Sequence, residues 1–316
     1  MRGGQRTELH AGGAARAAGV LRTYAELTKV RLVLLVVTTT AVGFLMASSG
    51  RPGVAQLCWT LIGTALAAAG SMALNQVLER ARDARMERTM HRPLPAGTIT
   101  PRHARVFGVL TASAGIAVLA VAANPLTAVL GLIVVLTYTL VYTPLKARTP
   151  LCTLAGALCG AIPPMMGWTA TGGGIGFGAW LLGGVLFLWQ IPHFLALAWL
   201  YRADYERGGF RMLPVVDASG RVTGQMAVLY SLALVPLGVL AALGSITGWL
   251  FAAGSVLLGS GLVALSLQLA TLRTDPVARR LFHATLVYLP LLLGLMVADK
   301  LPAASPLAVA LLSNVR

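Results

Sequence analysis

The sequence predicts an all-α, polytopic membrane protein with about nine transmembrane helices. Of its 316 residues, 57% are hydrophobic and only 11% are charged, whereas soluble domains carry roughly 25% charged residues. Apolar runs also recur along the chain, each close to the roughly 20 residues that cross the hydrocarbon core of a bilayer. The runs cover residues 31–49, 54–78, 105–123, 125–144, 151–169, 176–200, 224–246, 248–271 and 281–299.

The distribution of Lys and Arg predicts the orientation of these helices. With a cytoplasmic N-terminus, the outer segments hold only Arg51, Lys300 and Arg316, and the other basic residues fall on the cytoplasmic side. The C-terminus is then outside. This asymmetry accounts for the net charge of +15 without a nucleic-acid partner, because basic residues on that side face anionic lipid of the bilayer.

The chain divides into three predicted parts. Residues 1–24 are polar, rich in Gly, Ala and Arg, and lack the apolar core of a signal peptide, so we expect a disordered N-terminal arm. Residues 25–302 form the intramembrane domain, and residues 303–316 form a C-terminal tail. The longest cytoplasmic loops follow the second and sixth helices, and this spacing predicts two pseudo-repeated halves around a central cavity.

An acidic motif follows the second apolar run. Asn75, Glu79 and Asp83 are four residues apart, and each step of four turns a helix by only about 40°, so the three side chains share one face. Oxygen-bearing side chains at the end of a hydrophobic helix suit a hard cation such as Mg²⁺. Arg88 and Arg92 follow, and guanidinium groups pair with phosphate. The motif therefore predicts a pyrophosphate site at the membrane surface.

The second acidic loop supplies a candidate fourth metal ligand. Six of the ten acidic residues lie in the loops after the second and sixth helices. Asp204 is the best ligand in the second of these loops, and Arg202 beside it is a phosphate candidate. The alternative interpretation is a solvated helix at the membrane surface, in which Glu79 and Asp83 only neutralise neighbouring arginines.

Two further groups of residues lie near the predicted cytoplasmic side. The sixth helix carries Pro192 and His193 within its apolar span, where polar groups are costly and usually functional. His193 is a hydrogen-bonded core residue, an axial ligand of a haem-type iron, or an acid–base group. Tyr142, Lys146 and Arg148 end the fourth helix, where a point charge and a forked donor suit a diphosphate. The alternative is that Lys146 and Arg148 are ordinary basic residues flanking a membrane helix, and that Tyr142 lies at the membrane–water interface as many tyrosines do.

Over roughly residues 22–300, the chain resembles the UbiA superfamily of intramembrane prenyltransferases. The acidic motif is similar to NxxxDxxxD, and residues 86–94 resemble the MxRTxxRPL of the haem-farnesylating branch. The sequence departs from the pattern at Glu79, where Asp is usual, and at Gly208, which leaves the second loop without DxxxD. Other blocks in the same order are residues 27–31, 142–149, 192–194, 201–205 and 212–214.

The resemblance implies farnesyl transfer from farnesyl diphosphate to a vinyl group of haem B, giving haem O for terminal oxidases. It implies Mg²⁺ as cofactor and a multi-pass location in the bacterial cytoplasmic (inner) membrane. It also implies haem A synthase or oxidase assembly proteins as partners. The implied catalytic metal ligands are Asn75, Glu79, Asp83 and Asp204. The implied substrate-binding residues are Arg88, Arg92, Lys146, Arg148, Arg202, Tyr142 and Tyr205. We add His193 as a haem-binding residue on our own hypothesis, because it is a histidine at membrane depth.

Three other functions are compatible with parts of this pattern. A sister prenyltransferase acting on an aromatic quinone precursor would share the metal motif but not the blocks around residues 88–94 and 192–194. A secondary transporter would also have many spans and broken helices, but its polar groups would lie at the bilayer midplane. A haem-binding scaffold without catalysis would not require the acidic face.

Overall fold

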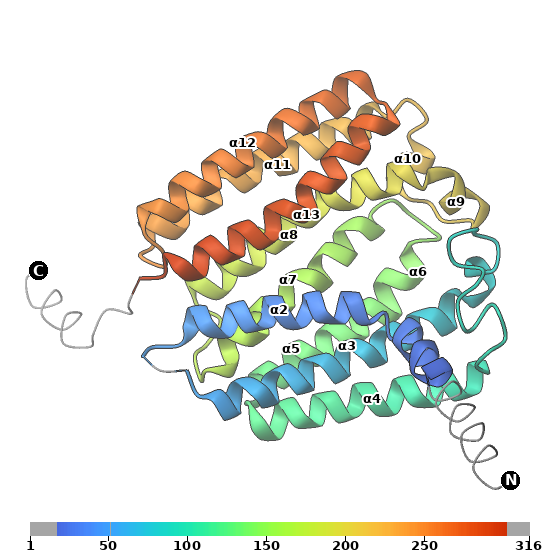
Figure 1. Cartoon of the computed structure of the whole chain (residues 1–316), viewed down its shortest axis with the longest axis horizontal. Helices are drawn as coiled ribbons and strands as arrows, with labels where there is room; N and C mark the ends of the chain where they lie inside the picture. Colours follow the sequence, from blue (N-terminus) through green and yellow to red (C-terminus); the bar gives the residue numbers. More distant parts are fainter. Residues whose placement is uncertain (1–17, 51, 302–316) are drawn as a thin grey trace, which may run out of the picture.

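The computed structural model describes residues 18–50 and 52–301, and this part of the chain is a bundle of helices (Figure 1). Its only β-type pairing there is an isolated bridge between Thr247 and Lys300. The elements are α2 (Val30–Ala47), α3 (Val54–Asp83), α4 (Pro101–Ala122), α5 (Pro125–Leu136), η1 (Thr137–Tyr142), α6 (Thr143–Leu145), α7 (Cys152–Ala170), α8 (Phe177–Leu200), α9 (Arg202–Arg207), α10 (Leu213–Val216), α11 (Arg221–Leu243), α12 (Trp249–Leu272) and α13 (Asp275–Ala298).

Within the described residues, eight helices are long and apolar enough to cross a membrane. They coincide with eight of the nine predicted runs, with α5, η1 and α6 together forming the fourth. The remaining run is α7, a helix of 19 residues that contains Pro163 and Pro164 and is less apolar than the others. The orientation and the ninth span stay predictions.

The long helices form two groups that meet along α7 and α8 (Figure 1). In one group α2, α3, α4, α5 and α7 contact one another, and in the other α8 contacts α11 and α13, with α12 packed against both. The predicted pseudo-repeat of two halves is compatible with this grouping and stays a prediction.

Glycines bring α3 and α4 into close contact. A Cβ placed on Gly70 would lie 2.5 Å from the backbone nitrogen of Ala112 and from the carbonyl oxygen of Gly108. Small residues allow such close approach between helices in a membrane, where packing and not the hydrophobic effect drives association. This contact fixes α3 immediately before Asn75, where the acidic motif begins.

The segment Thr137–Tyr142 is a π-helical turn within the fourth span. The pattern continues at Thr143, whose backbone N–H donates to the carbonyl of Tyr138 five residues earlier. The Thr143 hydroxyl donates to the same carbonyl at 2.7 Å. π-helical turns inside α-helices occur frequently at functional sites. Here the turn places Tyr142 and Thr143 beside α3, as the next subsection describes.

Residues 18–24 differ from the predicted disordered arm, because residues 18–27 are helical. The side-chain amide of Gln76 donates to the carbonyls of Glu26 and Leu27 at 2.8 and 3.0 Å, so it satisfies carbonyls that the end of a helix leaves free. Leu27 is fully buried. The rest of the arm, residues 1–17, and the whole predicted tail, residues 303–316, lie outside the described residues.

Candidate active site on the polar face of α3

The three side chains of the acidic motif lie on α3, which continues to Asp83, beyond the predicted end of the apolar run. Asn75, Glu79 and Asp83 are 0%, 4% and 0% exposed. Two buried carboxylates must be paired or bind cations, because an isolated charge away from water is strongly unfavourable. A solvated surface helix therefore does not describe this face.

Two basic residues from different segments pair with the two carboxylates. The ammonium group of Lys146 donates to Oε1 of Glu79 at 2.7 Å, and Nη1 of Arg92 donates to Oδ2 of Asp83 at 2.9 Å. The Lys146 side chain is 12% exposed and that of Arg92 is 24% exposed. The sequence predicted both basic residues to bind substrate, and that role stays a prediction; in the structure both are paired with the acidic motif.

Asn75 connects two more segments to the same face. Its carbonyl oxygen accepts a hydrogen bond from Nζ of Lys29 at 2.7 Å, and its amide donates to the hydroxyl of Thr143 at 3.0 Å. Lys29 reaches this position because its backbone has φ of 50°, in the left-handed region, immediately before α2 begins. Lys29 and Thr143 lie in two of the blocks that resemble the family, residues 27–31 and 142–149, but neither was predicted from the sequence as a site residue.

The other carboxylate oxygen of Asp83, Oδ1, is buried and has no hydrogen-bond partner among the described residues. A buried unpaired carboxylate oxygen in a native site calls for a ligand. The oxygen atoms that a metal ion could use on this face belong to two carboxylates and one side-chain amide. Hard cations such as Mg²⁺ prefer oxygen ligands. No group of three His, Cys, Asp or Glu side chains suited to a metal occurs in residues 18–50 and 52–301. A metal here would therefore complete its coordination with substrate oxygens and water, as Mg²⁺ commonly does.

Asp204 binds the first loop through hydrogen bonds to its backbone. Its Oδ1 accepts from the backbone N–H of Glu87 at 2.9 Å and from Arg207 at 2.7 Å, and its Oδ2 accepts from the N–H of Arg88 at 3.3 Å. Burial acts to raise the pKa of Asp204, but these hydrogen bonds outweigh it and hold the pKa below its ordinary value of 3.8. This arrangement favours a positioning role over the predicted role as a metal ligand.

The second loop also fixes the side chain of Arg88. The guanidinium lies over the rings of Tyr201 and Tyr205, at 4.9 and 5.6 Å from their centroids. Its Nη2 also donates to the hydroxyl of Tyr205 at 3.4 Å. Two aromatic faces hold a cation without using all its N–H donors, so Arg88 keeps donors for an anionic ligand.

Aromatic rings surround Lys146 as well. Its Nζ lies 5.1 Å from the ring centroid of Tyr142 and 5.0 Å from that of Phe210. The carbonyl of Lys146 accepts from the backbone N–H of Arg211 at 2.7 Å. The segment that contains Tyr142 and Lys146 is therefore joined to the second loop beside Glu79. The structure thus brings this segment, the acidic motif and the second loop together.

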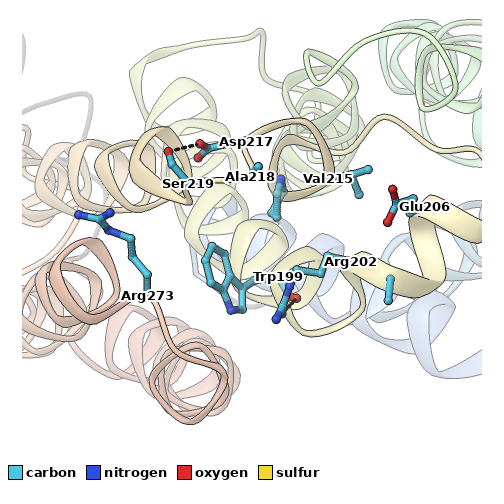
Figure 2. Close-up of a pocket in the computed structure, with 10 residues that line it drawn as sticks. Trp199, Arg202, Glu206, Val215, Asp217, Ala218, Ser219 and Arg273 are labelled. Carbon is cyan, nitrogen blue, oxygen red and sulfur yellow. Dashed lines mark hydrogen bonds between the residues drawn. The ribbon is translucent and has the colours of Figure 1, made fainter.

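Arg202 and Arg148 are not part of this contact network. Arg202 donates to Asp275 and to the carbonyl of Trp199, both at 2.7 Å. It lines a separate cavity of about 470 Å³ that Figure 2 shows, together with Asp217 and Arg273. Arg148 is exposed and makes no side-chain hydrogen bond within the described part of the chain. Neither contact pattern supports the predicted binding of diphosphate by these arginines.

His193 faces α13. Its Nδ1 lies 2.8 Å from the hydroxyl oxygen of Thr285, and its ring stacks between Trp189 and Phe282. None of its contacts in the described residues is to the α3 face. Thr285 was not identified from the sequence, because a threonine in an apolar helix carries no signal of its own.

Comparisons with known proteins agree with this architecture. The UbiA prenyltransferase family model matches residues 36–289. The chain is 39% identical over 292 residues to the protoheme IX farnesyltransferase of Solibacter usitatus, covering 89% of this chain and 99% of that protein. The corresponding enzyme of Koribacter versatilis is 41% identical over 296 residues, covering 90% and 94%. A UbiA homolog from Archaeoglobus fulgidus, solved bound to GPP and Mg²⁺, shares the fold, with a TM-score of 0.62 at 15% identity over 87% of this chain and 99% of that one. The chain belongs to the UbiA prenyltransferase family.

Proposed function

We propose that this protein transfers the farnesyl group of farnesyl diphosphate to a vinyl group of haem B, giving haem O and releasing diphosphate. Family membership and relatives about 40% identical that carry this activity in their names support the reaction. The observation in the structure that carries the proposal is the buried α3 face, where Lys146 pairs with Glu79, Arg92 pairs with Asp83, and Asp83 keeps its other oxygen unpaired among the described residues.

We propose that Asn75, Glu79 and Asp83 hold Mg²⁺ together with the substrate's diphosphate. The solved relative from Archaeoglobus fulgidus contains GPP and Mg²⁺, and its fold supports this assignment by analogy. When bound, Mg²⁺ supplies charge neutralisation to the departing diphosphate. This metal assignment uses the α3 residues alone and leaves Asp204 in its positioning role.

The residues around the metal ligands then act on the leaving group. Lys146, Arg92 and Arg88 donate hydrogen bonds to diphosphate oxygens, whose negative charge increases as the allylic C–O bond breaks and its electron pair moves to oxygen. Lys146 and Arg92 already lie at the α3 face, and they transfer from the carboxylates to the diphosphate when it binds. Arg88 belongs to the first loop, and its side chain lies against Tyr201 and Tyr205 of the second, so diphosphate would lie between the first and second cytoplasmic loops.

The allylic cation left by this cleavage must survive until the vinyl group attacks. The rings of Tyr142 and Phe210 lie beside Lys146, and aromatic faces stabilise cations through their quadrupole. Exclusion of bulk water from the site delays the attack of water on the allylic cation. The π electrons of the vinyl group then form the new C–C bond, and water adds to the resulting cation with loss of a proton.

The proposed location follows from the substrates and the fold. The farnesyl chain and the porphyrin are both apolar, and multi-pass helices place the site at a lipid bilayer. We propose the bacterial cytoplasmic membrane, with haem A synthase or oxidase assembly proteins receiving the product.

The test is an assay of purified protein with haem B, farnesyl diphosphate and Mg²⁺, with haem O measured by mass spectrometry. EDTA should abolish the product, and Asp83→Asn should lower turnover by at least about a hundredfold, because a bound metal contributes several kcal/mol to charge stabilisation. Asp275→Asn, which changes a carboxylate in the separate cavity region, is the matched control. Product from an aromatic quinone precursor instead of haem B, or turnover of Asp83→Asn equal to that of the control, would contradict the proposal.

A further inference from the structure

The ring of His193 is held in one orientation within the membrane-spanning part of α8. Trp189 lies one turn earlier on α8 and stacks on it at 5.1 Å between centroids with an interplanar angle of 19°. Phe282 of α13 stacks on it at 5.0 Å and 26°. Because both faces of the imidazole are covered, only its edge, with the two ring nitrogens, is available for polar chemistry.

The hydroxyl of Thr285 fixes which ring nitrogen carries the proton. Its Oγ1 lies 2.6 Å from the carbonyl oxygen of Phe282 and 2.8 Å from Nδ1 of His193. A hydroxyl has one proton, and a carbonyl can only accept, so the threonine proton goes to Phe282. Thr285 must then accept from His193, and Nδ1 is the N–H of the ring.

This turn of α13 is itself held in place. The indole N–H of Trp189 donates to the carbonyl of Thr285 at 2.9 Å, so the same side chain stacks on His193 and positions its partner. The contact fixes Thr285 relative to the ring and keeps the tautomer constant. Nε2 of His193 is left with a lone pair, and within residues 18–50 and 52–301 no hydrogen bond is formed to it.

A neutral imidazole with Nδ1–H bound to an oxygen and a free lone pair on Nε2 is the arrangement found in metal-ligating histidines. An acid–base role would need a proton donor or acceptor beyond Thr285, and no charged side chain contacts the ring in the described residues. Eight residues of helix separate His193 from Tyr201, about 12 Å at 1.5 Å per residue. That distance is comparable with the width of a porphyrin, and Tyr201 contacts Arg88 of the diphosphate site.

We infer that Nε2 of His193 binds the iron of the porphyrin acceptor, and that Thr285 is a positioning residue that sets the histidine tautomer. The inference rests on the proposed function for the identity of the acceptor. It adds the ligand atom, its protonation state and the residue on α13 that controls both.

The experiment titrates purified protein with haem B and records absorption and, for the reduced complex, the iron–histidine stretch by resonance Raman spectroscopy. His193→Gly should lose the histidine-ligated spectrum, and added imidazole should restore it, which also shows that the variant is folded. Thr285→Val removes the hydroxyl at nearly constant shape and should weaken haem binding roughly tenfold and shift the stretch, as loss of a ligand's oxygen partner does. Thr285→Ser should keep the wild-type spectrum.

His283→Ala is the matched control, because His283 lies beside Phe282 on α13 and is exposed. The inference is overturned if His193→Gly keeps the wild-type spectrum and affinity, or if His283→Ala loses the histidine-ligated spectrum in place of His193→Gly. Farnesyl diphosphate binding, measured in parallel by calorimetry, separates the two proposals. Wild-type protein that binds the diphosphate but no haem would overturn the acceptor in the proposed function, whereas haem binding without His193 ligation overturns this inference alone.

Discussion

At the scale of single residues, the α3 face is a set of buried charges, each paired with a cation from another segment. Glu79 and Lys146 are almost completely removed from water, at 5% and 12% side-chain exposure. Such a pair contributes little net stability compared with apolar residues, but removing one partner leaves an uncompensated buried charge. We therefore expect the loss of one partner to destabilise the fold as well as to impair the proposed chemistry.

Lys146→Met should lower the free energy of unfolding by about 3 kcal/mol, because it leaves Glu79 unpaired in a buried position. Adding Glu79→Gln should restore most of the loss. The measurement is unfolding in detergent followed by circular dichroism. Arg22→Met is the control, since Arg22 forms an exposed ion pair with Glu26, and such pairs contribute little. Equal effects of Lys146→Met and Arg22→Met would show that the buried pair is not needed.

The site could be predicted from the sequence only where its residues are close together in the chain. The spacing of Asn75, Glu79 and Asp83 is local, because a helix face follows from intervals of four residues. Lys29 and Thr143 are 46 and 68 residues from Asn75, and such contacts depend on how the helices pack. Similarly, the sequence identified Asp204 as a candidate metal ligand. Its hydrogen bonds from the backbone of Glu87 and Arg88 could not be predicted, because they depend on the relative position of two loops.

At the scale of elements, the loop after α3 and the loop after α8 hold each other in place. Asp204 accepts hydrogen bonds from the backbone of the first loop, and Arg82 donates to the carbonyls of Gly208 and Gly209 in the second, at 3.3 and 2.9 Å. The second loop thus accepts hydrogen bonds both from the last turn of α3 and from the loop that follows it. Long loops are often mobile, but these contacts favour a defined arrangement of Arg88.

Asp204→Ala should free the first loop, so the backbone amides of Glu87 and Arg88 should exchange with solvent roughly tenfold or more faster, because each loses a charged acceptor. Hydrogen exchange read by mass spectrometry measures this. Asp217→Asn, at a hydrogen-bonded carboxylate that binds Thr223 at the start of α11, is the control. If Asp204→Ala abolished Mg²⁺ binding without changing this exchange, Asp204 would be a ligand after all.

The lowered pKa of Asp204 also gives this contact a pH dependence. Its pKa is depressed in the folded protein, so its contribution is fully present above the ordinary value of 3.8 and is lost as the pH falls through the lower folded value. Exchange at Glu87 and Arg88 should therefore be independent of this group at neutral pH and rise only in strong acid, after correction for intrinsic exchange rates. Loop opening between pH 5 and pH 7 would contradict the assignment.

Elements were predicted best where periodicity or apolar length determines them. Eight predicted runs match helices of the described chain because length and hydropathy suffice to identify a membrane helix. Residues 18–24 were missed as a helix because they contain no long apolar run. The contacts of Leu27 and Gln76 at the end of this helix are tertiary. The π-helical turn at Thr137–Tyr142 was also missed, since one extra residue per turn has no composition signal.

At the scale of the whole molecule, the two groups of helices present loops at both ends of the bundle (Figure 1). Lys and Arg are concentrated in segments that the sequence assigns to the cytoplasm, and the α3 site lies at the same end as the loops around Arg88 and Asp204. The predicted orientation therefore makes the diphosphate site accessible from the cytoplasm.

This orientation predicts opposite labelling of two introduced cysteines. In a background with Cys58, Cys152 and Cys159 replaced, Ser219→Cys should react with a membrane-impermeant thiol reagent only from the cytoplasmic side. Gly174→Cys, at a position where a Cβ meets no atom within 4 Å, should react only from the outside. Labelling of intact cells and inverted vesicles compares the two. The reverse pattern would invert the topology.

The cations that pair with the α3 carboxylates determine the order of binding. A bare divalent ion must displace Lys146 and Arg92 from the carboxylates, and the displaced charges would then repel it. A metal that arrives with diphosphate brings anionic oxygens to which the same ammonium and guanidinium groups can transfer. Metal and diphosphate should therefore bind cooperatively, each raising the affinity of the other by the same factor, as thermodynamic linkage requires. The empty site would discriminate against free metal ions while accepting the loaded substrate.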